Sequence, residues 1–209
     1  MIDFLRENSS QLIVKIGEHL LISSLAIALG IVVAVPAGIA VTRSKKLSVI
    51  LITIASILQT IPSLALLSMM VPIIGIGKLP AIIALFIYSL LPIIRNTMLG
   101  INGVNEFLVD AGKGMGMTPN EIMFKIKLPL SAPVIMSGIR LSAVYVVSWT
   151  AIASYIGAGG LGDFIFSGLN TFDTNLIFLG TICVTMIAIC TDFLLGKLEK
   201  FIEPKTSSR

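Results

Sequence analysis

Charged residues are scarce in this chain of 209 residues. Asp, Glu, Lys and Arg make up 12% of it and hydrophobic residues 56%, whereas soluble domains carry about 25% charged residues. One histidine and two cysteines are present. The cysteines, Cys183 and Cys190, would lie about 10 Å apart along a straight helix, which is too far for a disulfide. These shortages argue against a soluble globular domain, a disulfide framework and a metal cluster.

Motifs for nucleotide binding and catalysis are also missing. No G-x-x-x-x-G-K-[ST] motif occurs, and residues 112–116, Gly-Lys-Gly-Met-Gly, lack its spacing and its Ser or Thr. The glycine-rich run 157–162 is no dinucleotide fingerprint, because no strand is expected before it. No nucleophile–base pair stands out, and no cleavage site of the A-x-A kind precedes the first apolar stretch. We therefore expect neither an ATPase nor another enzyme, and no cleaved signal peptide.

Long stretches without charge dominate the sequence instead. The stretch 20–42 is uncharged over 23 residues, or about 35 Å of helix, which is enough to cross a bilayer. The stretch 47–77 is too long for one simple span, and we interpret it as a span to about Met69 followed by a short outer turn. The sequence therefore predicts an all-α polytopic membrane protein with five spans. These spans cover residues 20–42, 47–69, 79–94, 132–156 and 174–192.

Basic residues in the loops predict the orientation of the spans. With the N-terminus outside, 12 of the 15 Lys and Arg residues lie in or toward the cytoplasm, as the positive-inside rule requires. The exceptions are Arg6, Lys15 and Lys78. The opposite orientation would violate the rule in nearly every loop, so we predict N-out and C-in. The net charge of +4 is explained by this topology and requires no nucleic-acid partner.

The chain is predicted to form one membrane domain with short polar ends. Residues 1–18 are interpreted as an amphipathic segment on the outer surface, with a frayed tail as the alternative. The apolar residues that suggest this segment are Phe4, Leu5, Leu12, Ile13 and Ile16. Residues 19–199 would form the transmembrane domain, with a cytoplasmic loop at about 95–129. Residues 200–209 would form a cytoplasmic tail.

One polar loop has a recognisable spacing. Residues 110–129 read D-A-G-K-G-M-G-M-T-P-N-E-I-M-F-K-I-K-L-P. This run resembles the cytoplasmic loop of bacterial ABC-importer permeases, whose pattern is E-A-A, three residues, Gly, nine residues, Ile, one residue and Leu-Pro. The spacing is met in full, with Asp replacing Glu and Gly replacing the second Ala. The matching residues are Asp110, Ala111, Gly112, Gly116, Ile126, Leu128 and Pro129.

The local sequence of this loop predicts two short helices. Residues 105–113 form the first, and the glycines at 112, 114 and 116 break it. The second has a good start signal, with Thr118 as cap, Pro119 at the first position and Glu121 at the third. Leu128-Pro129 is expected to end this second helix.

The resemblance implies a role for the second helix. It would be the coupling helix that docks in a groove of an ATPase subunit and transmits domain closure to the spans. Its exposed apolar residues, Ile122 and Phe124, would anchor that contact, whereas a passive amphipathic helix is the alternative. The residues assigned to coupling are those of the spacing pattern together with Thr118, Glu121, Ile122 and Phe124.

Polar and aromatic residues inside the spans are candidates for a translocation path. Polar groups and a helix breaker interrupt the second span at 59–63, and we expect a kink that faces a pathway, with ordinary helix packing as the alternative. Aromatic residues on the fourth span either line the path or belong to an aromatic belt. The path candidates are Gln59, Thr60, Pro62, Ser63, Met69, Tyr145 and Trp149.

Two other polar residues of the spans have expected positions. Arg140 should face the bundle interior, a wet cavity or the cytoplasm, because a charge in hydrocarbon is costly. Asp192 is its candidate partner. His19, at the outer end of the first span, is expected at the membrane interface rather than as a ligand.

Two further stretches, 58–67 and 156–170, resemble the osmoprotectant branch of type I importers, which takes up glycine betaine, carnitine and choline. Methionine-importer permeases share the five-span core and a similar glycine-rich stretch, and are the alternative within the class. The resemblance implies a bacterial cytoplasmic-membrane protein in contact with lipid. Its implied partners are a second permease copy, identical or related, ATPase subunits that bind ATP and Mg, and an extracytoplasmic substrate-binding protein. The chain itself would hold no cofactor.

A secondary transporter or channel is the rival class. Ion-coupled carriers usually have ionisable groups near the midplane or inverted repeats. Here the spans offer only Arg140, and no repeat is seen. A membrane-bound enzyme is a third class, but no catalytic constellation supports it.

Overall fold

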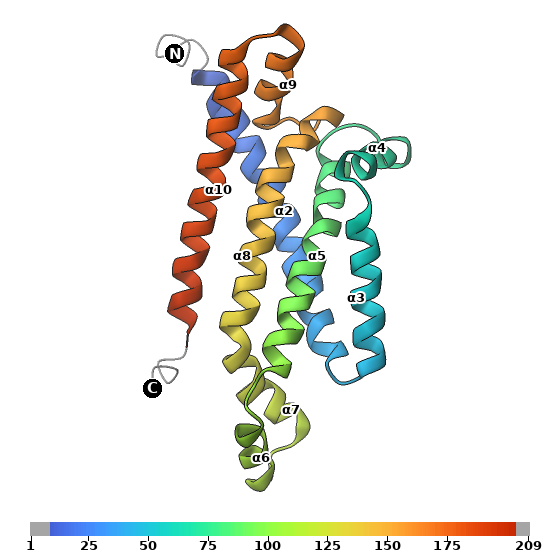
Figure 1. Ribbon diagram of the computed structural model, residues 1–209, viewed down its shortest axis with the longest axis vertical. Coiled ribbons are helices and arrows are strands. Elements are labelled where there is room, and N and C mark those ends of the chain that lie inside the picture. Colours follow the sequence, from blue (N-terminus) through green and yellow to red (C-terminus); the bar gives the residue numbers. More distant parts are fainter. Residues whose placement is uncertain (1–8, 204–209) are drawn as a thin grey trace.

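The computed structural model describes residues 9–203, and every regular element in this part of the chain is helical. The long helices are α2 (Ser9–Val41), α3 (Lys45–Thr60), α5 (Lys78–Asn102), α8 (Leu128–Ala153) and α10 (Thr174–Ile202). The shorter ones are α4 (Ser63–Ile74), α6 (Glu106–Gly114), α7 (Pro119–Glu121), the π-helical η1 (Ile122–Lys127), the 3₁₀ turn η2 (Ser154–Ile156) and α9 (Gly162–Thr171). The segments α6 and α7 lie at one end of the bundle and α9 at the other (Figure 1).

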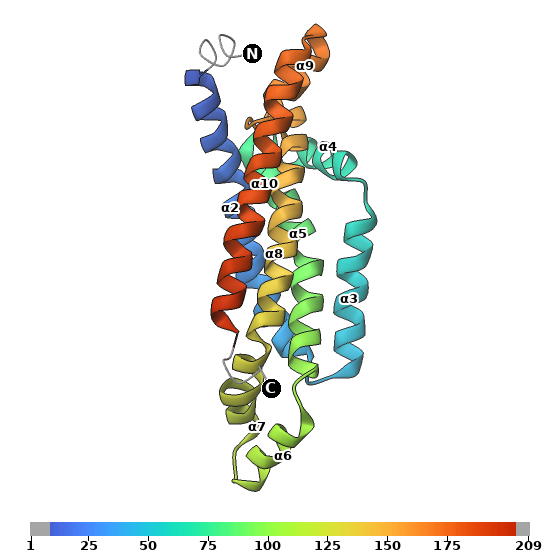
Figure 2. The ribbon, with the colours of Figure 1, turned by 60° about the vertical axis from the view of Figure 1, so that its left-hand side comes forward.

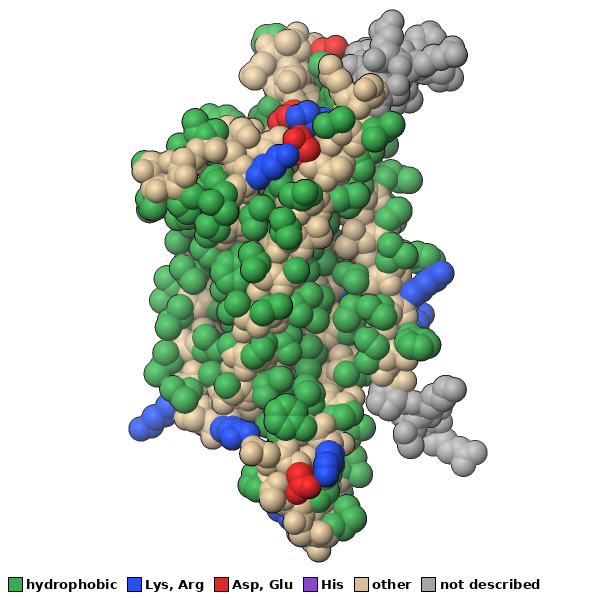
Figure 3. Space-filling model, turned by 180° about the vertical axis from the view of Figure 1, so that it is seen from behind, with side chains coloured by type: hydrophobic (Ala, Val, Ile, Leu, Met, Phe, Trp, Pro, Cys, Tyr) green, Lys and Arg blue, Asp and Glu red, His purple; other side chains and the backbone are tan. Residues whose placement is uncertain are grey.

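The predicted all-α fold with five spans is confirmed. Four helical segments among the described residues are long and apolar enough to cross a membrane, and the bent pair of α3 and α4 supplies the fifth. The third and fifth spans are longer than predicted, because α5 continues to Asn102 and α10 continues to Ile202. Hydrophobic side chains cover most of the middle of the rear face, as a lipid-facing surface requires (Figure 3).

Helix α5 forms the centre of the bundle, between α2 and α8, and small residues allow its neighbours to approach it closely. A Cβ added to Gly30 of α2 would lie 2.1 Å from the Ser89 hydroxyl of α5. One added to Gly138 of α8 would lie 2.4 Å from the Asn96 side chain of α5. Close contact between backbones is how membrane helices gain packing energy without a hydrophobic driving force.

The second span differs from the prediction. α3 ends at Thr60, and α4 is bent by 91° relative to it, so α4 runs across the direction of the long helices at the side of the bundle (Figures 1 and 2). The broken span reaches Met69, but only beyond this bend, because Met69 lies in α4. Proline cannot donate the helical hydrogen bond, which frees a carbonyl in the turn before Pro62. The Tyr88 hydroxyl of α5 donates a hydrogen bond to the Ile61 carbonyl and so satisfies a backbone group at the break.

The helix of the fourth span begins earlier in the chain than predicted. Residues 119–156 form one continuous helical run of 38 residues, so the expectation that Leu128-Pro129 ends a separate helix is wrong. The Leu128 N–H donates to the Met123 carbonyl, five residues back. Pro129 has no N–H, and in a regular α-helix its ring would collide with the carbonyl four residues back. The wider π-helical turn of η1 provides an arrangement that accommodates this proline.

The opposite end of the bundle contains the first turns of α2 and the segments that pack on them. Residues 9–18 form the first turns of α2 without a break before the predicted span, whereas Phe4 and Leu5 lie outside the described residues. His19 is fully buried, with its Nε2 atom 2.9 Å from the Val147 carbonyl oxygen, so the expected interfacial position is wrong. Gly160 covers this ring, and a Cβ at Gly160 would lie 3.4 Å from the His19 Nδ1 atom.

Charged side chains join three helices at this end. Glu18 of α2 accepts a hydrogen bond from the Gly160 backbone N–H at 3.1 Å and pairs with Lys78 of α5 at 2.8 Å. Lys15 of α2 pairs with both Glu18 and Asp163 of α9. Figure 3 shows a mixed group of acidic and basic side chains near one end. The glycine-rich turn is therefore attached to the bundle despite its composition.

Candidate functional site

The loop with the recognisable spacing begins with a capped helix. The Asn105 side chain accepts a hydrogen bond from the Phe107 N–H and caps α6. Lys113 pairs with Asp110 one turn earlier at 2.8 Å, and this partner raises the pKa of the lysine above its usual value. Gly116 follows α6 with a φ of 79°, a left-handed conformation that favours glycine. The predicted turn at Gly116 is present, although Gly112 and Gly114 belong to α6 itself.

The predicted cap of the second helix is confirmed. The Thr118 side chain accepts from the Glu121 N–H, and the Glu121 carboxylate accepts from the Thr118 N–H, which is a complete capping box. Pro119 occupies the first helical turn, where a backbone N–H would have no hydrogen-bond partner within the helix. Lys125 adds an ion pair to Glu121 at 2.9 Å. The helix start is therefore held by contacts local to the loop.

The two arms of the loop pack against each other through Gly112. A Cβ added to Gly112 would lie 2.7 Å from the Ile126 side chain and 3.5 Å from that of Ile122. Ile122 is only 6% exposed, so its expected role as an exposed anchor is wrong. Its side chain instead helps to hold α6 on η1. Gly112 and Ile126, at the third and fifth matching positions of the spacing pattern, thus meet in space.

Several large apolar side chains are exposed on this projecting end of the molecule, and three of them are more than half exposed. Phe107 is 83% exposed, Met115 is 74% exposed and Phe124 is 59% exposed. They come from α6, the turn and η1, which together project beyond the long helices (Figures 1 and 2). We call these three residues the apolar tip. Such aromatic and methionine side chains are typical anchors of protein interfaces.

The path candidates of the fourth span lie on an exposed stripe of α8. Val134, Leu141, Tyr145 and Ser148 recur at helical spacing and are all exposed. The Tyr145 ring stacks on the Trp149 ring, with centroids 5.6 Å apart and planes 24° apart. Trp149 also meets the Tyr88 ring of α5 edge-on at 4.8 Å. The sequence missed Tyr88, which connects these rings to the helix break at Ile61.

The path candidates of the second span surround that break. Gln59 and Thr60 end α3, Pro62 precedes α4, and Ser63 begins it. The Thr60 hydroxyl donates to the Ile57 carbonyl within its own helix. Met69 lies in α4 and is 59% exposed. The structure therefore brings Tyr145, Trp149 and the break together through Tyr88.

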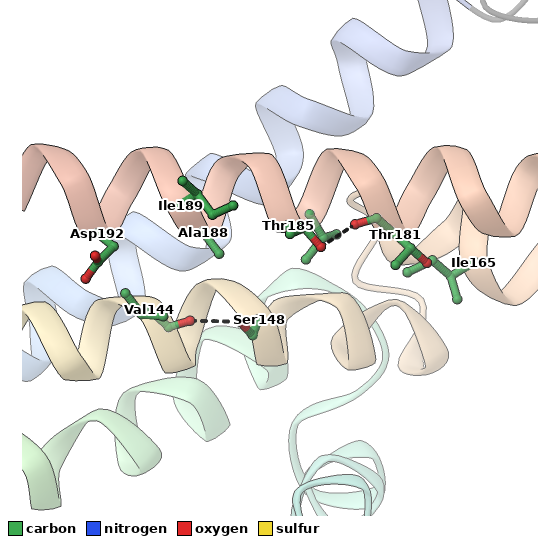
Figure 4. A pocket seen from close by; sticks show the side chains of 9 residues that line it. Val144, Ser148, Ile165, Thr181, Thr185, Ala188, Ile189 and Asp192 are labelled. Carbon is green, nitrogen blue, oxygen red and sulfur yellow. Dashed lines mark hydrogen bonds between the residues drawn. The ribbon is translucent and has the colours of Figure 1, made fainter.

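A second polar feature lies between α8 and α10. Arg140 of α8 binds Asp192 of α10 through two hydrogen bonds and Glu199 through a third at 3.1 Å. The predicted pairing of Arg140 with Asp192 is confirmed, whereas Glu199 gave no signal in the sequence. Figure 4 shows Asp192 facing Val144 across a groove between the two helices. This groove has a volume of about 500 Å³ and is lined further along by Ser148, Thr181 and Thr185.

The hydroxyl groups of this groove are satisfied within their own helices. Ser148 donates to the Val144 carbonyl at 2.9 Å, and Thr185 donates to the Thr181 carbonyl at 2.8 Å. Such back-bonding is common where a membrane helix carries Ser or Thr. The groove therefore offers no free donor from these two residues.

Comparison with known proteins identifies the family. Residues 26–206 match the family model described as the binding-protein-dependent transport system inner membrane component. The chain belongs to this family. It is a permease subunit of a transport system and not an enzyme.

Permeases of Listeria monocytogenes and Bacillus subtilis are similar to this chain over nearly its whole length. The carnitine transport permease protein OpuCB of Listeria monocytogenes is 54% identical over 205 residues, which cover 98% of this chain and 94% of that protein. The glycine betaine/carnitine/choline transport system permease protein OpuCB of Bacillus subtilis (strain 168) is 50% identical over the same shares of each chain. The choline transport system permease protein OpuBB of the latter organism is 49% identical over 100% of this chain and 96% of its own length.

A solved structure confirms the type I importer fold. A chain of the MetNI methionine ABC transporter, in an inward-facing conformation, superposes with a TM-score of 0.84 and covers 94% of this permease and 98% of that chain. The two are only 22% identical in sequence. This likeness shows the fold alone, because one fold serves many substrates.

Proposed function

We propose that this permease forms the membrane path of an ATP-driven importer of quaternary-ammonium osmoprotectants such as glycine betaine, carnitine and choline. The observation that carries the proposal is the identity of about half of all residues to permeases named for carnitine and choline transport, over nearly the whole length of each chain. Methionine is the weaker alternative, since only the fold supports it.

The apolar tip is the surface on which an ATPase subunit docks. A capped helix start, a packed contact at Gly112 and exposed Phe107 and Phe124 give a rigid element with hydrophobic anchors. ATP and Mg are bound by that partner, because this chain has no P-loop. The loop residues of the spacing pattern thus serve coupling by shaping the tip, and Phe124 serves it by contact.

The orientation is N-out and C-in in a bacterial cytoplasmic membrane. The positive-inside rule supports it, because the basic residues of the predicted loops then lie in the cytoplasm. In this orientation the apolar tip and the end of α10 face the cytoplasm, on the same side as the ATPase. The opposite end, with α9 and the glycine-rich turn, then receives the extracytoplasmic substrate-binding protein. A second permease copy, identical or closely related, completes the path beside the exposed stripe of α8.

Transport by the assembled importer tests the proposed function. The permease is reconstituted in liposomes with its ATPase and binding protein, and ATP-driven uptake of labelled glycine betaine, carnitine, choline and methionine is measured. We expect uptake of at least one quaternary-ammonium compound and none of methionine. Uptake of methionine alone would contradict the proposal and favour the amino-acid alternative.

A further inference from the structure

The aromatic rings of α8 form a surface with a defined geometry. Tyr145 and Trp149 lie one helical turn apart, and their rings are nearly parallel at 5.6 Å. Trp149 is held from the other helix by the Tyr88 ring, which meets it edge-on. Tyr88 is itself 3% exposed and donates its hydroxyl hydrogen to the Ile61 carbonyl. The ring arrangement is therefore fixed by packing and by a hydrogen bond, and is not a loose surface feature.

The Tyr145 ring is open to a ligand. It is 42% exposed and lies on the exposed stripe of α8. Trp149 is partly buried against the core and supports this ring from behind. Quaternary ammonium groups bind to aromatic faces within about 6 Å of the ring centroid by cation–π attraction.

The stretches of sequence that surround the rings contain no charged residue. The stretches 47–77, 79–94 and 141–162, which include the break, most of α5 and the outer half of α8, contain no Asp, Glu, Lys or Arg. A cation at this level therefore finds no carboxylate on these stretches. Asp192 of α10, which lines the groove beside Val144 and Ser148, is already paired with Arg140. Aromatic faces therefore remain to stabilise the cation, and they suit a tetra-alkyl ammonium, which has no N–H to donate.

We propose that Tyr145 and Trp149 form a binding site inside the permease for the quaternary ammonium group of the transported substrate, with Tyr88 positioning the rings. This inference rests on the proposed substrate class. A cation–π site is weak enough to release its ligand, as a site on a translocation path must be. Such a site lets the permease select against analogues that are neutral or carry a single alkyl group on the nitrogen, after the binding protein has released its substrate.

Graded fluorination of the ring at position 145 tests the proposal. Fluorine withdraws electron density from the ring face and weakens cation–π attraction while leaving the shape nearly unchanged. In the full reconstituted importer, Tyr145→Phe serves as the reference, and mono-, di- and trifluorinated phenylalanine are placed at the same position. We expect the kcat/KM for choline uptake to fall stepwise with each fluorine, over a total of about two- to thirtyfold.

Matched substitutions distinguish the effect of the aromatic ring from the effect of side-chain size. Trp149→Phe should retain most uptake and Trp149→Leu should lose it, whereas Phe193→Leu should have no effect. Phe193 is the control because it is 60% exposed on α10, where its ring faces Lys197 and not the stacked pair. Substrate binding to the separate binding protein, measured alone, must be unchanged throughout.

The outcomes distinguish failure of the site from failure of the function. If the unaltered importer takes up no quaternary-ammonium compound, the proposed function fails. If it does take one up and the fluorination series is flat, the aromatic site is overturned and the function stands. A fluorination effect on assembly of the complex, with unchanged uptake, would assign the rings to the contact between permease copies and would also overturn the site.

Discussion

Arg140 of α8 and Asp192 of α10 are joined by two parallel hydrogen bonds, 2.6 Å from Nε to Oδ1 and 2.7 Å from Nη2 to Oδ2. Helix α10 exposes most of its surface in the single chain and packs against α8 and α9, so this pair strengthens its attachment to α8. Gly196 of α10 allows the approach, since a Cβ there would lie 2.9 Å from the guanidinium carbon. The planar fork of arginine suits two-point binding of a carboxylate, which lysine does not offer.

Removal of one partner of this pair should destabilise the permease more than removal of both. We expect Asp192→Ala to lower the Tm of the purified complex by several degrees, because it leaves a guanidinium in the membrane domain with only Glu199 as partner. The double variant Arg140→Met with Asp192→Leu should recover most of that loss. Equal loss in the two variants, measured by thermal unfolding in detergent, would show that the pair is not coupled.

The left-handed turn at Gly116 should tolerate no branched side chain. Its φ is 79° and nothing lies within 4 Å of an added Cβ, so the cost of Gly116→Val comes from backbone strain, about 1–2 kcal/mol. We expect substrate-stimulated ATP hydrolysis to fall several-fold, because the two arms of the loop lose their relative position. Insertion in the membrane should be unchanged.

Gly114→Ala is the matched control for that variant. Gly114 lies two residues away, also has nothing within 4 Å of an added Cβ, and is the last residue of α6. Stimulated ATP hydrolysis in Gly114→Ala should match the unaltered complex. A similar fall in both variants would mean that the loop is sensitive to any substitution and that the left-handed conformation is not the cause.

Features that depend on local sequence were predictable. The Thr118 cap needs only residues within one turn of each other, and the five apolar stretches need only their length. The break at Pro62 was predicted as a kink, but its 91° bend was not. At that bend Tyr88 of α5, 27 residues along the chain, donates a hydrogen bond to the Ile61 carbonyl. Such a contact between distant residues leaves no trace in the local pattern.

The errors at Ile122 and His19 share one cause. Each side chain is buried because a glycine elsewhere in the chain leaves room beside it: Gly112 beside Ile122, and Gly160 beside His19. A short amphipathic segment does not reveal which of its apolar residues faces such a gap. The π-helical turn of η1 also shifts the angular phase of the side chains that follow, so ordinary helical periodicity assigns the faces of this segment incorrectly.

The orientation of the permease can be tested with one cysteine at each end. In a background with Cys183→Ala and Cys190→Ala, we introduce Met115→Cys at the apolar tip or Ile76→Cys at the α4–α5 turn, which are 74% and 75% exposed. In intact cells, a membrane-impermeant thiol reagent should label the second variant only. After permeabilisation it should label both. Labelling of Met115→Cys in intact cells would overturn the N-out and C-in assignment.

Coupling to the ATPase should depend on the apolar tip. Phe124 is 59% exposed in the single chain, so replacing it with Asp costs little within the permease itself. At an interface, a buried unpaired carboxylate is costly, and truncation of a good anchor alone costs more than about 1 kcal/mol. We therefore expect Phe124→Asp to abolish co-elution of the ATPase, or to leave an assembled complex without uptake.

Two further variants show whether the effect belongs to that contact. Phe124→Leu keeps an apolar side chain of similar reach and should retain assembly and at least partial uptake. Phe107→Asp on α6 is the second variant. Phe107 is 83% exposed and belongs to the same tip, so its substitution should weaken ATPase binding as well. Size-exclusion co-elution and ATP-driven uptake in liposomes are measured for each. Normal assembly and uptake in both aspartate variants would place the ATPase contact elsewhere, since no charge at the tip would then have been buried.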